Sequence, residues 1–187
     1  VRKLVYTSTP SVVFGFDNLC DADETQPYPA RSASKYGRSK ALAEREVLEA
    51  NSEHLATAAI RPHLVYGPGD LNMVPRLVQR AKSGRLRQIG AGENLVDVLY
   101  VENASRAHLQ LAEAIEADGS CGGQAYFLGQ DQPVRMWGFI DQILEMHGTR
   151  RGRGRVPLGV AYWAGAFVEA LAWMRGYRGD NLPMTRF

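Results

Sequence analysis

Hydrophobic and polar positions along the chain alternate between two periodicities. Short apolar runs at 3–9 (KLVYTST) and 55–67 (LATAAIRPHLVYG) predict buried strands. Between them, a loop rich in Gly, Asp and Pro spans about 14–30, and a helical pattern covers about 34–50. Further helices are predicted at 74–84, 104–115 and 136–148, and further strands at 85–90, 95–101 and 124–129. Asn103 is the predicted N-cap of the helix at 104–115. This alternation is typical of an α/β fold with a largely parallel sheet.

The helix predicted at 34–50 carries an unusual mixture of residues on one face. At about 100° per residue, Tyr36 and Lys40 share a stripe with Ala43 and Val47, whereas most charged residues lie on the other side. The small apolar residues mark the side that meets the sheet, so we expect Tyr36 and Lys40 to point inward. A lysine on a buried face is unfavourable unless a partner holds its charge, and the chain has only 4 Lys beside 18 Arg. The position of Lys40 therefore indicates a function.

Proton transfer is the chemistry that suits this pair. A free tyrosine hydroxyl titrates near pH 10, and a cation about 4–6 Å away lowers such a pKa by roughly one to three units. The spacing i to i+4 supplies that neighbour, so Tyr36 is a candidate general acid or base with Lys40 as its electrostatic partner. A Tyr-x-x-x-Lys spacing arises by chance in a chain of this composition about one time in six, so the spacing alone does not establish catalysis.

The ends of two predicted strands add to this candidate site. Ser8 and Thr9 lie at the carboxyl end of the first strand, where open α/β sheets place ligands. A hydroxyl there would hydrogen-bond a carbonyl or carbinol oxygen that Tyr36 protonates or deprotonates. The run RPHLVYGPGD at 61–70 would pass beneath a flat ligand ring.

Several separate motifs, in the same order, resemble one superfamily. YTST, YGRSK and RPHLVYGPGD are similar to the extended short-chain dehydrogenases/reductases. More narrowly, ALAEREVL, NLVDVLYVEN and PLGVAY resemble the 3β-hydroxysteroid dehydrogenase branch, which includes sterol-4-carboxylate 3-dehydrogenases and 2-alkyl-3-oxoalkanoate reductases. The resemblance runs from residue 1 to residue 187. It implies the C-terminal part of a Rossmann-type doubly wound parallel sheet with a small substrate-binding region.

The resemblance also implies roles for individual residues. Tyr36 is the expected catalytic acid/base, Lys40 lowers its pKa and holds the nicotinamide ribose, and Thr9 orients the substrate oxygen. The expected cofactor-binding residues are Tyr36, Lys40, Ser8, Pro62 and His63. We interpret His63 as a packed residue beside the cofactor rather than as a proton-transfer group.

The implied cofactor is NAD or NADP, which exchanges a hydride with a secondary alcohol or ketone. The family's glycine-rich phosphate-binding turn has no counterpart in the chain, so we expect a fragment whose sheet is completed by upstream residues. The expected parts are the second half of the cofactor domain at 1–70, a substrate-binding region with interleaved Rossmann elements at 71–155, and an apolar helical tail at 156–187.

Two stretches bear on the substrate. Residues 94–98 read Asn-Leu-Val-Asp-Val, where similar nucleotide-sugar enzymes have an Arg-Asp pair followed by an aromatic. Arg85 and Arg87 could meet a phosphate, although loop arginines are more often solvated. The segment 156–174 has Glu169 as its only charged residue and arginines on both sides. As a helix of about 28 Å it would cover the substrate pocket, contact a membrane surface peripherally, or span a bilayer. A sterol or long-chain β-keto acid is therefore favoured over a sugar nucleotide.

Composition limits the function classes further. A net charge of +2 gives no excess of the kind that indicates nucleic-acid binding. Two cysteines, Cys20 and Cys121, make neither a disulfide framework nor a metal site, which favours the cytoplasm. Membrane association and a homodimer are left open. Two alternative functions are also left open: a nucleotide-sugar epimerase or dehydratase, and a relative that binds the cofactor without turnover. A relative without turnover would have no need of the Tyr36 and Lys40 pair.

Overall fold

The structure is a computed structural model that describes residues 1–16, 19–117, 120–152 and 154–174. The predicted α/β class with parallel strands is confirmed. The strands are β1 (Lys3–Thr7), β2 (Ala56–Pro62), β3 (Leu64–Tyr66), β4 (Gln88–Ile89), β5 (Leu95–Val96), β6 (Val98–Tyr100), β7 (Ala125–Leu128), β8 (Val134–Arg135) and β9 (Arg155–Val156). The helices are α1 (Lys35–Glu49), α2 (Met73–Lys82), α3 (Val101–Ala117), α4 (Met136–Met146) and α5 (Leu158–Met174), with a short 3-10 turn, η1 (Pro10–Val12).

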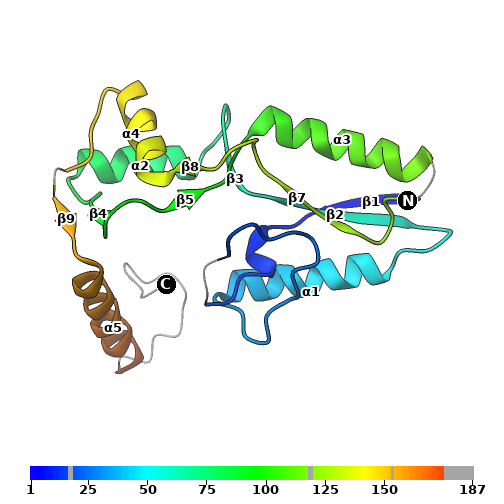
Figure 1. The fold of residues 1–187 in the computed structure, drawn as a ribbon, viewed down its shortest axis with the longest axis horizontal. Helices are drawn as coiled ribbons and strands as arrows, with labels where there is room; N and C mark the ends of the chain where they lie inside the picture. Colours follow the sequence, from blue (N-terminus) through cyan, green and yellow to red (C-terminus); the bar gives the residue numbers. More distant parts are fainter. Residues whose placement is uncertain (17–18, 118–119, 153, 175–187) are drawn as a thin grey trace. The chain divides into compact units, whose positions relative to one another are not determined.

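The chain forms two compact units, and the first comprises 1–68 and 97–132. It contains a parallel sheet in the order β1-β2-β7, with α1 and α3 on opposite faces (Figure 1). The central strand β2 is covered on both faces, which is why its sequence is a continuous small and apolar run rather than an alternating one. Ala58, Ala59 and Ile60 of this strand are buried. A second pair of parallel strands, β3 and β6, belongs to the same unit.

Two predicted strands are divided in the structure. The run 55–67 is interrupted at His63, because β2 pairs with β7 whereas β3 pairs with β6. The run 95–101 is interrupted at Asp97, since β5 pairs antiparallel with β8 and β6 pairs parallel with β3. The choice of a distant partner strand, which local periodicity does not contain, divides both runs.

The predicted cap of the third helix is wrong. Helix α3 begins at Val101, two residues before Asn103, so Asn103 lies inside its first turn. The Asn103 side-chain amide instead donates a hydrogen bond to Gln130 Oε1 at 3.1 Å. This contact joins α3 to the residues that follow β7.

The second unit comprises 69–96 and the described part of 133–187. Its core lies between α2 and α4 and consists of Ala81, Leu86, Ile140 and Leu144, with Leu77, Val78, Met136 and Trp137 packed against them. Asp70 begins α2 by accepting hydrogen bonds from the backbone N–H groups of Asn72, Met73 and Val74. These hydrogen bonds satisfy donors that the first turn of any helix leaves unpaired.

Helix α5 has a mostly apolar sequence, and many of its described side chains are exposed. Ala161 is buried, whereas the exposed large apolar side chains are Leu158, Val160, Tyr162, Trp163, Phe167 and Met174. None of the described helices is both long and apolar enough to cross a membrane. Residues 175–187 of the predicted tail, and Arg153 before it, lie outside the described residues.

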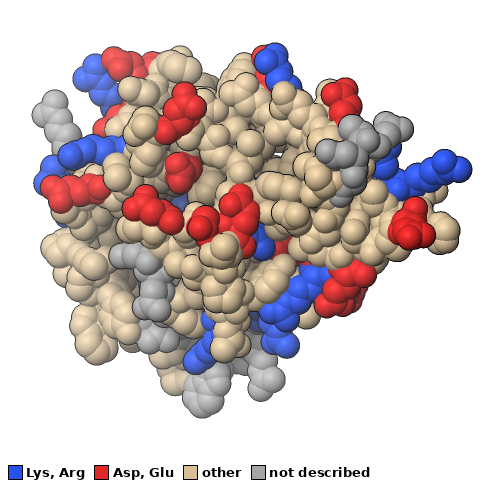
Figure 2. All heavy atoms as spheres, turned by 45° about the vertical axis from the view of Figure 1, so that its right-hand side comes forward, with Lys and Arg blue, Asp and Glu red and all other residues tan. Residues whose placement is uncertain are grey.

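On the face of the molecule drawn in Figure 2, charged side chains are distributed without a dominant sign. Figure 2 shows one face of the molecule, on which basic and acidic side chains are interspersed among uncharged ones. This distribution agrees with the small net charge of +2.

Candidate active site

Helix α1 begins directly against the turn that follows β1. Ser34 is its N-cap, and the Ser34 side chain accepts a hydrogen bond from the backbone N–H of Gly37 at 2.9 Å. A Cβ atom at Gly37 would lie 2.6 Å from the carbonyl oxygen of Ser11 in η1, so only glycine permits this approach. The first turn of α1, which carries Tyr36, is thereby brought beside η1, whose N-cap is Thr9.

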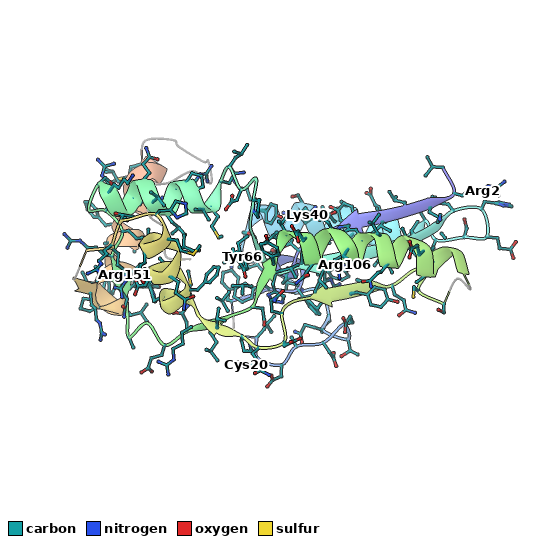
Figure 3. The ribbon with its side chains drawn as sticks, turned by 90° about the horizontal axis from the view of Figure 1, so that it is seen from above. Arg2, Cys20, Lys40, Tyr66, Arg106 and Arg151 are labelled. Atoms are coloured by element: carbon teal, nitrogen blue, oxygen red, sulfur yellow. The ribbon has the colours of Figure 1, made fainter. Side chains whose placement is uncertain are left out.

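Lys40 points toward the sheet, as its position in the sequence predicted. Its Nζ atom donates a hydrogen bond to the carbonyl oxygen of Thr7, the last residue of β1, at 2.5 Å. The same atom lies 4.3 Å from the centroid of the Tyr6 ring. Figure 3 shows Lys40 near the carboxyl end of β1. The lysine is therefore held by the strand end where parallel sheets bind ligands.

The inward orientation predicted for Tyr36 is wrong. The Tyr36 side chain is 58% exposed, and its hydroxyl forms no hydrogen bond within the described part of the chain. The buried positions of α1 are Gly37 and Glu44, so the face that meets the sheet is rotated by about one residue from the predicted stripe. Tyr36 consequently lies at the margin of that face, with a hydroxyl that is accessible to a ligand.

Thr9 and Ser8 both follow β1, and their hydroxyls have different surroundings. The Thr9 hydroxyl accepts a hydrogen bond from the backbone N–H of Ser11 and donates one to the Ser11 hydroxyl, each at 3.3 Å. Thr9 is partly buried. Ser8 is only 4% exposed, and its hydroxyl forms no hydrogen bond within the described part of the chain.

A buried ion pair beneath α1 was missed by the sequence analysis. Glu44, which is fully buried, accepts hydrogen bonds from Arg61 of β2: Nη2 lies 2.7 Å from Oε1, and Nε lies 3.2 Å from each carboxylate oxygen. Tyr28, from the loop between β1 and α1, donates its hydroxyl to the same carboxylate at 2.6 Å. Glu44 follows Gly37 by seven positions and Lys40 by four. Positions 37, 40 and 44 therefore fall on one stripe of the helix, and a charged residue on that stripe was the signal that could have revealed the ion pair.

The three groups shift one another's proton affinities. Burial alone disfavours the charged carboxylate of Glu44, but the hydrogen bonds from Arg61 and Tyr28, together with the charge of Arg61, outweigh burial, and the pKa of Glu44 falls below its ordinary value. The pKa of Arg61 is raised, because contact with Glu44 outweighs the opposing effect of burial. Burial and the Glu44 carboxylate raise the pKa of Tyr28 to about 12. At neutral pH the trio is thus a carboxylate, a guanidinium and a neutral phenol.

His63 and Pro62 lie where β2 ends. The backbone N–H of His63 donates to the carbonyl of Leu128 in β7 at 2.9 Å. The His63 ring is half-buried, with its centroid 6.1 Å from that of Phe127, and its Nδ1 lies 3.8 Å from Asp97 Oδ2. Burial lowers the pKa of His63, and Asp97 opposes this effect. These contacts pack the His63 ring between Phe127 and Asp97, and its place beside the cofactor stays a prediction.

Comparison with known proteins adds the family. The model of the 3-beta hydroxysteroid dehydrogenase/isomerase family matches residues 1–158. The chain belongs to this family. A family member in Stenotrophomonas maltophilia (strain K279a), named 2-alkyl-3-oxoalkanoate reductase, is 42% identical over 190 residues, which cover 100% of this chain and 57% of that protein. A mouse member, named sterol-4-alpha-carboxylate 3-dehydrogenase, decarboxylating, is 38% identical over 177 residues, covering 93% and 49%.

The chain spans about half the length of these family members. Solved structures show the same fold. A dTDP-glucose 4,6-dehydratase from Bacillus anthracis str. Ames, in complex with NAD, has a TM-score of 0.60 at 25% identity and covers 83% of this chain and 49% of its own. MoeE5 in complex with UDP-glucose and NAD has a TM-score of 0.63 at 27% identity, covering 84% and 52%. The expected family and the expected Rossmann-type fold are both confirmed.

The buried ion pair predicts an acid-sensitive contribution to stability. Because the pKa of Glu44 is lower in the folded protein, the contribution is present above the ordinary value of 4.5 and is lost as the pH falls through the lowered value. Glu44→Gln leaves the Arg61 charge unpaired and should destabilise the protein by about 3–5 kcal/mol near neutral pH. Denaturant unfolding of both proteins from about pH 7 to about pH 3 should show this difference shrinking below pH 4.5. A difference that stays constant across this range would contradict the assignment.

The close approach at Gly37 predicts an unusual effect of alanine. Helix propensity alone favours alanine over glycine by about 1 kcal/mol, yet the added Cβ would lie 2.6 Å from the Ser11 carbonyl. Gly37→Ala should therefore destabilise the protein, by about 1–3 kcal/mol, because the contact forces the backbone to shift. Gly138→Ala in α4 is the matched control, since its nearest neighbour would be 3.9 Å away. Equal urea midpoints for the two variants would show that α1 does not need glycine here.

Proposed function

We propose that the protein is an NAD(P)-dependent oxidoreductase that interconverts a secondary alcohol and a ketone on a bulky hydrophobic substrate. Its relatives are named for such chemistry on 2-alkyl-3-oxoalkanoates, 3β-hydroxysteroids and sterol carboxylates. One structural observation carries the proposal. An ammonium group, Lys40, is fixed at the carboxyl end of β1, and an accessible tyrosine hydroxyl lies one helical turn before it.

The proposed proton transfer uses three residues of the first unit. Tyr36 gives a proton to the substrate oxygen during reduction or takes one during oxidation. Lys40 stabilises the phenolate form through its charge. The Thr9 hydroxyl, which now donates to Ser11, would turn to the substrate oxygen and orient it.

The described residues also fit the nicotinamide end of a cofactor. One N–H of the Lys40 ammonium group donates to the Thr7 carbonyl, and the remaining N–H groups would bind the nicotinamide ribose. Pro62 and His63 would form the surface that the nicotinamide passes. Ser8, which the sequence analysis also expected at the cofactor, is only 4% exposed, so its hydroxyl is not accessible to a ligand in this arrangement. The cofactor itself supplies the hydride.

A hydrophobic ketone is favoured over a nucleotide sugar as the substrate. Leu95 is 61% exposed in the stretch 94–98, where a sugar nucleotide would call for charged partners. The dTDP-glucose 4,6-dehydratase and MoeE5, the latter in complex with UDP-glucose, share the fold with this chain at 25–27% identity. Turnover of UDP-sugars with no action on hydrophobic ketones would reverse this preference.

Replacement of Tyr36 tests the proposed chemistry. Tyr36→Phe in the full-length protein removes the proton-transfer group and should lower turnover on the order of 10²–10⁴-fold. The affinity for the cofactor should change little, because the substitution removes only one hydroxyl. Turnover of a 2-alkyl-3-oxo acid or a sterol ketone, together with cofactor titration, provides the measurement. Tyr126→Phe is the control, because this hydroxyl in β7 donates to Gln124 Oε1 and contacts none of the proposed site residues within the described part of the chain. Undiminished turnover in Tyr36→Phe would refute the function.

We further propose that α5 contacts a membrane surface peripherally. Trp163 and Phe167 are 72% and 69% exposed, and the exposed arginines Arg150 and Arg155 precede the helix, a combination suited to the boundary of an anionic bilayer. A pocket cover and a homodimer interface are the other uses of the same surface.

Vesicle binding distinguishes these uses of α5. The full-length protein should co-float with anionic phosphatidylserine vesicles, and a Trp163→Ser, Phe167→Ser double variant should bind several-fold less, because it loses apolar area. Leu71→Ser removes an even more exposed apolar side chain outside α5, and this variant should bind vesicles normally. Absence of binding by the unmodified protein would contradict the proposal, and a change in sedimentation of the double variant would point to a dimer.

A further inference from the structure

Two neighbouring residues of β1 hold Lys40 without neutralising it. The Nζ atom lies 4.3 Å from the centroid of the Tyr6 ring and donates to the Thr7 carbonyl at 2.5 Å. Within the described part of the chain, Lys40 forms no ion pair with a carboxylate. The ring face and the carbonyl oxygen both carry partial negative charge. They attract an ammonium group and leave its full charge available to other groups.

The orientation of Tyr6 follows from the alternation of side chains along β1. Lys3 and Thr7 point toward α3: Lys3 Nζ donates to a carbonyl of that helix, and the Thr7 hydroxyl bonds His108 Nε2 at 2.8 Å. Tyr6 lies between them in sequence and points to the opposite face, which α1 covers (Figure 1). The Tyr6 ring is therefore part of the strand surface that Lys40 meets.

We propose that Tyr6 is a positioning residue, whose ring face and the adjacent Thr7 carbonyl together fix the Lys40 ammonium for its action on Tyr36. This inference rests on the oxidoreductase function proposed above. A lysine side chain has several rotatable bonds and samples many rotamers unless contacts select one. Among the described residues, Tyr6 is the one whose side chain contacts the Lys40 ammonium group, since the other contact is with the main-chain carbonyl of Thr7. It acts through Lys40 and does not itself exchange a proton with the substrate.

Two substitutions at this position separate the ring face from the hydroxyl. Tyr6→Phe keeps the face and should retain kcat/KM within about twofold, whereas Tyr6→Leu removes the face and should lower kcat/KM by about 2- to 30-fold. Alcohol oxidation requires Tyr36 to lose its proton, so the rising limb of the pH–rate profile should move to higher pH in Tyr6→Leu. The reason is that a less fixed ammonium stabilises the phenolate less. A purely structural role of Tyr6 would lower the rate without moving this limb.

Several outcomes overturn the inference. Tyr6→Leu with an unchanged rate and pH profile would do so, and so would a loss in Tyr6→Phe as large as that in Tyr6→Leu. If Tyr6→Leu fails to fold, a fluorinated phenylalanine at position 6 keeps the ring shape, makes its face less negative, and must still move the pH limb. The Tyr36→Phe result separates the two proposals. Turnover that persists in Tyr36→Phe would contradict the proposed oxidoreductase function itself. Turnover that is lost in Tyr36→Phe but unchanged in the Tyr6 variants would contradict only the positioning role of Tyr6.

Discussion

The buried contact between Glu44 and Arg61 is the interaction on which the candidate site depends. Two charges taken out of water are stable only when each satisfies the other, and here the pair has three nitrogen–oxygen hydrogen bonds. The Arg61 guanidinium also lies 5.1 Å from the Phe127 ring and 5.7 Å from the Tyr28 ring. Because Glu44 is in α1 and Arg61 is in β2, the contact fixes how α1 is rotated about its axis against the sheet. Tyr28 ties the loop between β1 and α1 to the same point.

That rotation determines what each turn of α1 presents. Glu44 meets Arg61, Lys40 one turn earlier meets the end of β1, and Gly37 one turn before that meets the Ser11 carbonyl. The three contacts lie along one stripe, so none of them can shift alone. Tyr36, one position from Gly37, falls beside the stripe and exposes its hydroxyl. The helix thus offers a tyrosine hydroxyl, the proposed proton-transfer group, to a ligand, while the partly buried Lys40 and the buried Glu44 carboxylate hold the helix in place.

Sequence reasoning predicted the parallel α/β class, the positions of most helices and the approach of Lys40 to the sheet, because these depend on local periodicity and on residue type. The sequence analysis placed Tyr36 on the buried face of the helix because it identified that face by its apolar residues. Glu44 is charged, so this criterion did not assign it to the buried face. The identity of the Glu44 partner could not be predicted, since Arg61 reaches it only through the packing of β2 beneath α1. The division of 95–101 at Asp97 was missed for a related reason: each half pairs with a strand far away in the sequence.

A structure of the full-length protein with NADH bound tests the central claim most directly, because it locates the nicotinamide relative to α1 and β1. The account predicts that Lys40 Nζ lies within hydrogen-bond distance of a ribose hydroxyl, and that the Tyr36 hydroxyl faces the same side of the nicotinamide ring as the Thr9 hydroxyl. A cofactor whose nicotinamide is bound away from the carboxyl end of β1, with Tyr36 still facing solvent, would contradict it.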